Sequence, residues 1–187
     1  MKRALVAFSI IVLACAPQVR PTAVSGFALK TVAGAPFVLG ASVEQSPFTV
    51  FEFFSADCPV QKAHDQRLIE LYRRYQTQGV QFFAVDSEMG ASTEHAVQEK
   101  RKRGYPFPML IDEQSRFADS LGASYSTFSI VVDRTGTIRY QGGIDSDRVR
   151  PRPDSTPYLQ NALDDLLAGR APRQAVGNVY GCMLRKW

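Results

Sequence analysis

Cys58 has the residue type and the position of a group that does chemistry. It lies between an apolar run of strand formers and Pro59, and proline is favoured in the first turn of a helix. At a helix N-terminus, unpaired backbone N–H groups and the helix dipole favour the thiolate, which is the reactive form of cysteine. The position therefore predicts redox chemistry at Cys58. Three residues later, where a dithiol motif would have its second cysteine, the chain has Gln61.

Glu52 is the second candidate. It interrupts an otherwise apolar strand pattern (49–54), six residues before Cys58. A carboxyl group that is buried in an apolar site has a raised pKa and is suited to proton transfer near neutral pH. We therefore predict that Glu52 accepts a proton during thiol chemistry. The alternative is that its side chain turns to solvent.

The first fifteen residues predict export. Two basic residues precede an apolar segment (4–14) that is too short to cross a bilayer and has the length typical of a signal peptide. The segment ends in a pattern that resembles a bacterial lipobox, in which Cys15 is the lipidated residue. We expect an exported protein of the bacterial periplasm or cell envelope, held at the membrane by a lipid anchor on Cys15. Ordinary cleavage beside a neighbouring alanine is the alternative.

Two cysteines, Cys58 and Cys182, remain once Cys15 is assigned to the lipid anchor. An even pair in an exported protein indicates a disulfide, because that compartment is oxidising. Two independent thiols are the alternative. Sequence separation does not decide between them, since a bridge requires Cα atoms within about 7 Å of each other.

Length and charge limit the remaining classes of function. A chain of 187 residues is expected to form one domain with a substantial core. Its net charge of +4 is small and dispersed, which argues against a nucleic-acid partner. The basic run 100–103 is interpreted as a solvated helix end. We predict no resident metal and no cofactor.

The order of the expected elements predicts an α/β fold. Strand-forming runs alternate with helical stripes, and such alternation implies a parallel-containing sheet covered by helices. The expected strands are 27–31, 37–39, 49–54, 80–85, 109–111, 128–132 and 137–140, and the expected helices are 59–76, 92–103, 114–121 and 155–167. The expected organisation is a signal peptide (1–15), a tether (16–26), one domain (27–169) and a C-terminal tail that contains Cys182 (170–187).

These features resemble a known family. A buried strand followed by Cys58-Pro59 and a helix, together with a later strand that ends in Asp133-Arg134-x-Gly136, is similar to the thioredoxin fold. Within that fold, the chain resembles the exported redoxins of the AhpC/TSA and TlpA-like thiol–disulfide oxidoreductase group. The resemblance covers about 27–169 and includes the Gly-Cys-x-x-Arg pattern at 181–185. It implies a central mixed β-sheet flanked by helices, with an N-terminal β-hairpin extension.

The resemblance also implies roles for single residues. Thioredoxin has a buried acid at the offset of Glu52, and a loop with a cis-proline faces its active cysteine and docks the substrate. The matching loop here contains Ser126 and Thr127 in place of that proline. Asp57 replaces the tryptophan that precedes the cysteine in thioredoxins, and its negative charge is expected to raise the pKa of Cys58.

The favoured hypothesis is a thiol–disulfide redox protein of the cell envelope. In it Cys58 attacks a disulfide, Pro59 begins the active helix, Glu52 manages the proton and Cys182 resolves the intermediate. Its partners are protein clients with thiols or disulfides, or a redox donor in the envelope.

Three alternatives stay open. The first is a weak peroxiredoxin-type antioxidant. The second is a Cu(I)-handling protein with Cys58, Cys182 and either His64 or His95 as ligands, although we expect both histidines to face solvent. The third is a redoxin fold without turnover that serves as an interaction module.

Overall fold

The computed structural model describes Val24 and residues 27–187. The predicted signal peptide with Cys15, and almost all of the predicted tether, lie outside these residues. Within the described part, no helix is both long and apolar enough to cross a membrane.

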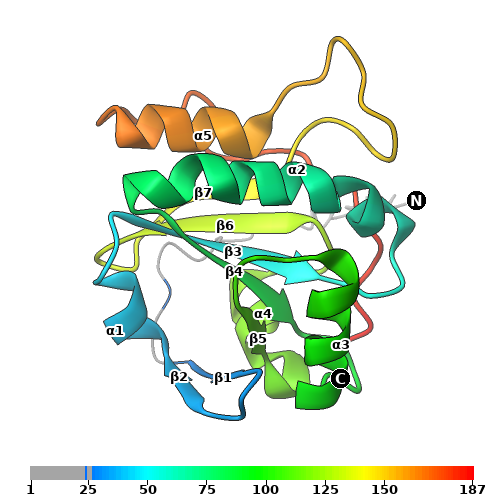
Figure 1. Cartoon of the computed structure of the whole chain (residues 1–187). Helices are drawn as coiled ribbons and strands as arrows, with labels where there is room; N and C mark the ends of the chain where they lie inside the picture. Colours follow the sequence, from blue (N-terminus) through cyan, green and yellow to red (C-terminus); the bar gives the residue numbers. More distant parts are fainter. Residues whose placement is uncertain (1–23, 25–26) are drawn as a thin grey trace, which may run out of the picture.

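A seven-stranded mixed sheet forms the centre of the molecule (Figure 1). Its strand order is β2-β1-β5-β4-β3-β6-β7. The pairs β3–β4 and β4–β5 are parallel, and the other neighbours are antiparallel. The strands are β1 (Ala28–Thr31), β2 (Pro36–Val38), β3 (Phe48–Phe54), β4 (Gln81–Asp86), β5 (Met109–Ile111), β6 (Phe128–Asp133) and β7 (Ile138–Gly143).

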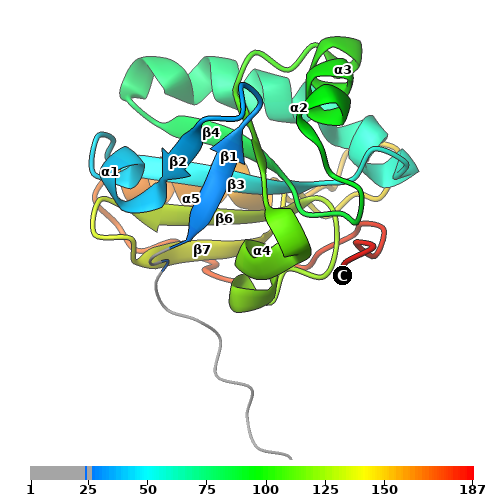
Figure 2. The same cartoon turned by 90° about the horizontal axis from the view of Figure 1, so that it is seen from below.

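Helices cover both faces of this sheet. α2 and α5 pack on one face, where their apolar stripes meet Val50 and Val131. α1 and α4 cover the other face, around Phe51 and Phe117 (Figure 2). The prediction of a mixed sheet flanked by helices, with an N-terminal hairpin, is confirmed. The helices are α1 (Leu39–Val43), α2 (Pro59–Tyr75), α3 (Thr93–Arg103), α4 (Arg116–Leu121) and α5 (Tyr158–Leu167), with 3-10 turns at Gln76–Gln78 and Glu113–Ser115.

The central strand β3 positions the predicted thiol. β3 lies between β4 and β6, and all of its residues after Phe48 are buried. This explains its nearly continuous apolar sequence, which is typical of a strand covered on both faces. β3 ends at Phe54, and Cys58 follows directly before the first residue of α2.

Two local predictions were wrong. Leu39, which we expected at the end of the second hairpin strand, is instead the first residue of the short helix α1. The last helix begins at Tyr158 and not at Ser155, because the Ser155 hydroxyl does not cap the helix. It donates instead to Asp147 at 2.8 Å, in the loop that precedes α5.

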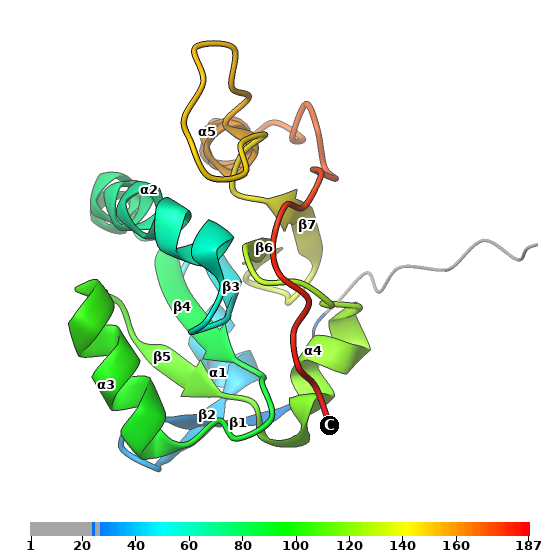
Figure 3. The same ribbon diagram turned by 90° about the vertical axis from the view of Figure 1, so that its right-hand side faces the viewer.

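The C-terminal tail runs back across one end of the sheet (Figure 3). After α5 it passes β7, where Val176 pairs with Gln141 and the N–H of Gly143 donates to the carbonyl of Asn178 at 3.1 Å. The tail then reaches the loop that precedes β6. It therefore returns Cys182 to the end of the sheet from which α2 begins.

Candidate active site

Cys58 is the N-cap residue of α2. Its backbone is extended, and its sulfur accepts a hydrogen bond from the main-chain N–H of Gln61 at 3.4 Å. Only 2% of the residue is exposed. The predicted position at a helix N-terminus is therefore observed, with Pro59 as the first residue of the helix.

The tail docks on the loop before β6 as a short antiparallel strand. The N–H of Ser126 donates to the carbonyl of Cys182 at 2.9 Å, and the N–H of Leu184 donates to the carbonyl of Ser124 at 2.9 Å. Between them, Tyr125 pairs with Met183. Main-chain hydrogen bonds thus fix the register of the tail, so that Cys182 lies opposite Ser126.

The docked tail brings Cys182 to Cys58. The N–H of Cys182 donates to the sulfur of Cys58 at 3.2 Å and to the hydroxyl of Ser126 at 3.1 Å. Both cysteines are free thiols in this structure. The two cysteines and the loop residue Ser126, which the sequence analysis singled out separately, form one cluster.

The hydrogen bonds around Cys58 favour its thiolate. Burial by itself would raise the pKa of Cys58, but hydrogen bonds from Cys182, Ser126 and Gln61 outweigh burial and lower the pKa below its ordinary value. Burial and the neighbouring Cys58 raise the pKa of Cys182. Of the two thiols, Cys58 therefore loses its proton at the lower pH.

Asp57 does not have the effect that the sequence analysis expected. Its carboxylate is exposed and pairs with the guanidinium of Arg185 in the tail at 2.9 Å. Arg185 also lies 3.5 Å from Glu88. The expected net increase in the pKa of Cys58 was wrong, because the charge of Asp57 is compensated and hydrogen-bond donors surround the sulfur.

Glu52 is buried in the central strand, so its side chain does not turn to solvent. It is 1% exposed, and the hydroxyl of Ser129 on β6 donates to its Oε2 atom. Its Oε1 atom has no hydrogen-bond partner among the described residues. Burial raises the pKa of Glu52 to about 8, and the bond from Ser129 offsets this only in part. At neutral pH both protonation states of this carboxyl are therefore accessible.

Gln61 belongs to a buried polar network behind Cys58. Its side-chain amide donates to the hydroxyl of Tyr105 at 3.3 Å, and that hydroxyl donates to Asp65. Asp65 in turn pairs with Arg103 at 2.7 Å. The prediction that the basic run 100–103 is solvated was therefore wrong for Arg103, whose side chain is buried. In the sequence, Gln61 stood out only as a missing cysteine.

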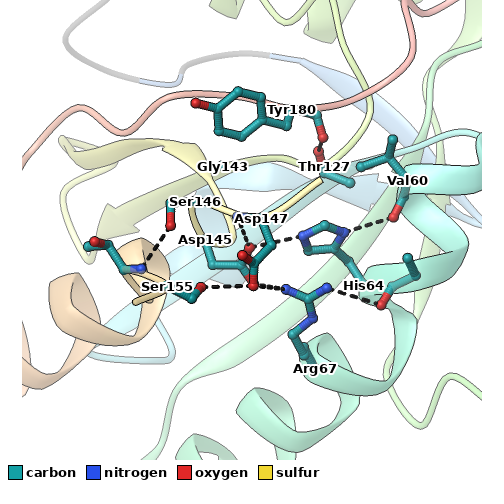
Figure 4. A network of polar contacts seen from close by, with 12 residues as sticks. Val60, His64, Arg67, Thr127, Gly143, Asp145, Ser146, Asp147, Ser155 and Tyr180 are labelled. Atoms are coloured by element: carbon teal, nitrogen blue, oxygen red, sulfur yellow. Dashed lines mark hydrogen bonds and ion pairs between the residues drawn. The ribbon is translucent and has the colours of Figure 1, made fainter. Parts of the chain in front are cut away.

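His64 is buried, which corrects the expectation that it faces solvent. Only 1% of it is exposed, and both ring nitrogens are occupied (Figure 4). Nδ1 donates to the carbonyl of Val60 at 2.8 Å, and Nε2 contacts Asp145 at 3.1 Å. Arg67 also binds Asp145, and it lies 3.2 Å from Asp147. This network joins α2 to the loop after β7.

The histidines do not complete a metal site with the two cysteines. His64 is engaged as described, and the ring of His95 contacts Asp86 at 3.3 Å. Across the residues that the structure describes, no group of three or more His, Cys, Asp or Glu side chains could hold a metal ion.

Comparison with known proteins places this geometry in a family. The family model described as AhpC/TSA matches residues 22–141, which is more than half of the chain. The chain belongs to the AhpC/TSA family. The resemblance drawn from the sequence is thereby confirmed. The matched region ends before the tail, so it does not include Cys182 of this AhpC/TSA protein.

Two solved structures are similar to this chain over nearly its whole length. A hypothetical protein from Sinorhizobium meliloti is 26% identical, with a TM-score of 0.81 over 90% of this chain and 95% of that one. An uncharacterized conserved protein from Geobacillus kaustophilus is 29% identical, with a TM-score of 0.80 over 91% and 94%. No curated protein matches this AhpC/TSA chain.

A more distant structure shows the fold alone. A secreted disulfide oxidoreductase of Mycobacterium tuberculosis is 20% identical to the AhpC/TSA chain, with a TM-score of 0.53 over 76% of this chain and 95% of that one. The thioredoxin-like fold that the sequence predicted is therefore confirmed.

Proposed function

We propose that this protein is a thiol–disulfide oxidoreductase in which Cys58 and Cys182 alternate between a dithiol and a disulfide. The observation that carries the proposal is the bond of 3.2 Å from the N–H of Cys182 to the sulfur of Cys58. It joins two residues that lie 124 positions apart in the chain, and Cys182 supplies the second thiol that Gln61 does not.

The reaction proceeds in two exchanges. The Cys58 thiolate attacks one sulfur of a client disulfide, whose S–S bond breaks, and one client thiolate leaves. Cys182 then loses its proton and attacks the sulfur of Cys58, which releases the second client thiolate. Two electrons pass from the protein dithiol to the client disulfide, and a redox donor of the thiol class restores the dithiol. The same steps in reverse would oxidise a client dithiol.

Glu52 serves as the proton acceptor in this scheme. Deprotonation of Cys182 requires a base, because its pKa is raised. Glu52 has a pKa of about 8 and lies on β3, opposite Ser129, which follows the docking loop by two residues. Glu52 therefore can take up and return a proton near neutral pH.

The resemblance implies that the client docks near Ser126 and Thr127. The tail covers both residues, so docking there requires the tail to move aside first. Export and a lipid anchor on Cys15 belong to the same proposal, since the basic and apolar leader supports them. In that setting the clients are envelope proteins with thiols or disulfides.

Trapping a mixed disulfide between Cys58 and a client distinguishes this function from its alternatives. Cys182→Ser should accumulate a mixed disulfide between Cys58 and a small disulfide-bonded client protein, and Cys58→Ser should accumulate none. Intact-mass measurement and peptide mapping identify the linked residues. A wild-type protein that reduces client disulfides no faster than Cys58→Ser would contradict the proposal and favour the non-catalytic module.

Peroxide is the second candidate substrate, because the family and the lowered pKa of Cys58 both favour it. A thiolate and a hydroperoxide yield a sulfenic acid and an alcohol, and Cys182 would then displace water to form the same disulfide. A dimedone adduct on Cys58 in Cys182→Ser, formed with hydrogen peroxide at a rate above that of a free thiol, would identify this activity.

A further inference from the structure

We propose that Gln61 and Thr127 act together as positioning residues that latch the C-terminal tail in place and so present Cys182 to Cys58. This inference rests on the function proposed above. It assigns to that site two residues whose bonds within the latch do not involve the reacting sulfur atoms. The latch is defined as the side-chain amide of Gln61 together with the main-chain N–H and the hydroxyl of Thr127.

The amide of Gln61 is the buried end of the latch. The residue is fully buried, and its Oε1 atom accepts a hydrogen bond from the N–H of Thr127 at 3.1 Å. Because a main-chain N–H can only donate, the amide oxygen must face Thr127 and the amide nitrogen must face Tyr105. Both ends of the amide are therefore fixed, which is the arrangement expected of a buried polar group that sets a geometry.

Thr127 is the middle of the latch and has an unusual backbone. Its φ of 58° is one of three positive values at non-glycine residues in the described part of the chain. A β-branched residue is strained in this region, so its surroundings must hold it there. The N–H of Thr127 donates to Phe53 at 3.0 Å as well as to Gln61. A proline at this position, as in thioredoxins, has no N–H and could make neither bond.

The hydroxyl of Thr127 is the end that holds the tail. It donates to the carbonyl of Tyr180 at 2.8 Å (Figure 4). Two residues later, the N–H of Cys182 reaches Cys58. Gly181, between them, lies so close to the loop that an added Cβ would be 1.9 Å from the carbonyl oxygen of Ser126. The latch therefore fixes the tail immediately before the residue that must react.

The two departures from the thioredoxin pattern are thus bonded to each other. Gln61 stands in place of the second cysteine, and Thr127 stands in place of the cis-proline. Together they hold the tail, which contains the second thiol, Cys182. A resolving thiol that is held in place reacts at a high effective concentration, whereas a thiol on a free tail does not. The latch should therefore raise the equilibrium constant for the Cys58–Cys182 disulfide.

Glutathione redox buffers test the latch. Cys58 attacks glutathione disulfide and releases one glutathione; Cys182 then attacks Cys58 and releases the second, so two electrons pass to glutathione. Gln61→Leu removes the bond to Thr127 together with the bond to Tyr105, and Thr127→Val removes the bond to Tyr180. Both substitutions keep the approximate volume of the side chain. Each should lower the equilibrium constant of the Cys58–Cys182 disulfide by about tenfold, the effect of one buried hydrogen bond.

Two matched variants separate positioning from folding. Thr127→Ser keeps the hydroxyl and should retain a near-wild-type equilibrium constant. Tyr105→Phe removes the other partner of the Gln61 amide and should leave the constant within about twofold of wild type, because the bond to Thr127 persists. The rate of Cys58 alkylation as a function of pH should move to higher pH in Gln61→Leu and Thr127→Val, and not in the two controls.

The outcomes are distinct. A wild-type protein that forms no Cys58–Cys182 disulfide in any buffer would overturn the proposed function, and the latch with it. If the wild type forms the disulfide, and Gln61→Leu and Thr127→Val form it with the same equilibrium constant as the wild type, the latch alone is overturned. Should Gln61→Leu fail to fold, the contrast between Thr127→Val and Thr127→Ser decides the question.

Discussion

The main-chain N–H of Cys182 donates a hydrogen bond to the sulfur of Cys58, 124 positions earlier in the chain. The bond makes the tail part of the reactive centre in two ways. The main chain of Cys182 stabilises the Cys58 thiolate, and its side chain supplies the second thiol. These two contributions can be separated by mutation.

Cys182→Ala and Cys182→Pro separate the thiol from the N–H. Both lose the thiol, but only proline loses the N–H that reaches Cys58. We expect the pH midpoint of Cys58 alkylation by iodoacetamide to be about one unit higher in Cys182→Pro than in Cys182→Ala, since one donor to the thiolate is removed. Equal midpoints in two folded variants would show that the N–H does not stabilise the thiolate.

The burial of the two thiols predicts that a bulky reagent reaches Cys182 more easily than Cys58. Cys58 is 2% exposed, whereas Cys182 is partly exposed and covers it. A maleimide coupled to polyethylene glycol should therefore modify Cys182 first, even though Cys58 has the lower pKa. Peptide mapping after partial reaction measures the order. Faster labelling of Cys58 by the bulky reagent would mean that the tail leaves the site readily in solution.

Glu52 predicts a pH-dependent stability. Its pKa is about 8 in the folded protein, against an ordinary value of 4.5, so the unfolded chain releases this proton first as the pH rises. The folded state should lose stability from about pH 4.5 to about pH 8, by roughly 2–4 kcal/mol for this group. Glu52→Gln should lack this loss and be more stable than wild type at pH 8.

Chemical denaturation at a series of pH values measures this difference. Glu113→Gln is the matched control, because Glu113 is exposed and pairs with Lys30 at the surface. The free energy of unfolding of Glu113→Gln should depend on pH in the same way as that of the wild type. If the free energies of unfolding of Glu52→Gln and the wild type change in parallel from pH 5 to pH 8, Glu52 does not have a raised pKa.

The network around Asp145 predicts a large loss of stability on one substitution. Asp145→Asn removes the charge that faces His64 and Arg67. Loss of one partner from a buried ion pair leaves the others uncompensated, so we expect a decrease of roughly 2–4 kcal/mol in the free energy of unfolding. Asp154→Asn, at an exposed carboxylate 3.8 Å from Arg152, should change it by less than about 0.5 kcal/mol. A similar small effect at Asp145 would contradict this view of the network.

The fold could be predicted because its signals are local. The apolar runs of β3 and β4 and the Cys58-Pro59 start of α2 stand in consecutive residues, and their order identifies the sheet. Cys58 and Glu52 could be predicted for the same reason, since one follows and the other interrupts the same strand.

The rest depends on contacts between distant segments. The docking of Cys182 rests on main-chain hydrogen bonds to Ser126, which leave no periodic pattern in the sequence. The burial of His64 depends on Asp145, 81 positions later. From the sequence we expected His64 to face solvent, because an ion-paired histidine on a buried face looks like a surface residue in a sequence.

The return of the tail to Cys58 has a consequence for the unfolded chain. A bond between Cys58 and Cys182 would close a loop that contains most of the domain, because 124 positions separate them. Chain-entropy models assign about 5 kcal/mol to a loop of this length. Oxidation would thus remove a large part of the conformational freedom of the unfolded ensemble. The redox state of one pair of sulfurs would then also determine how strongly the entire domain resists unfolding.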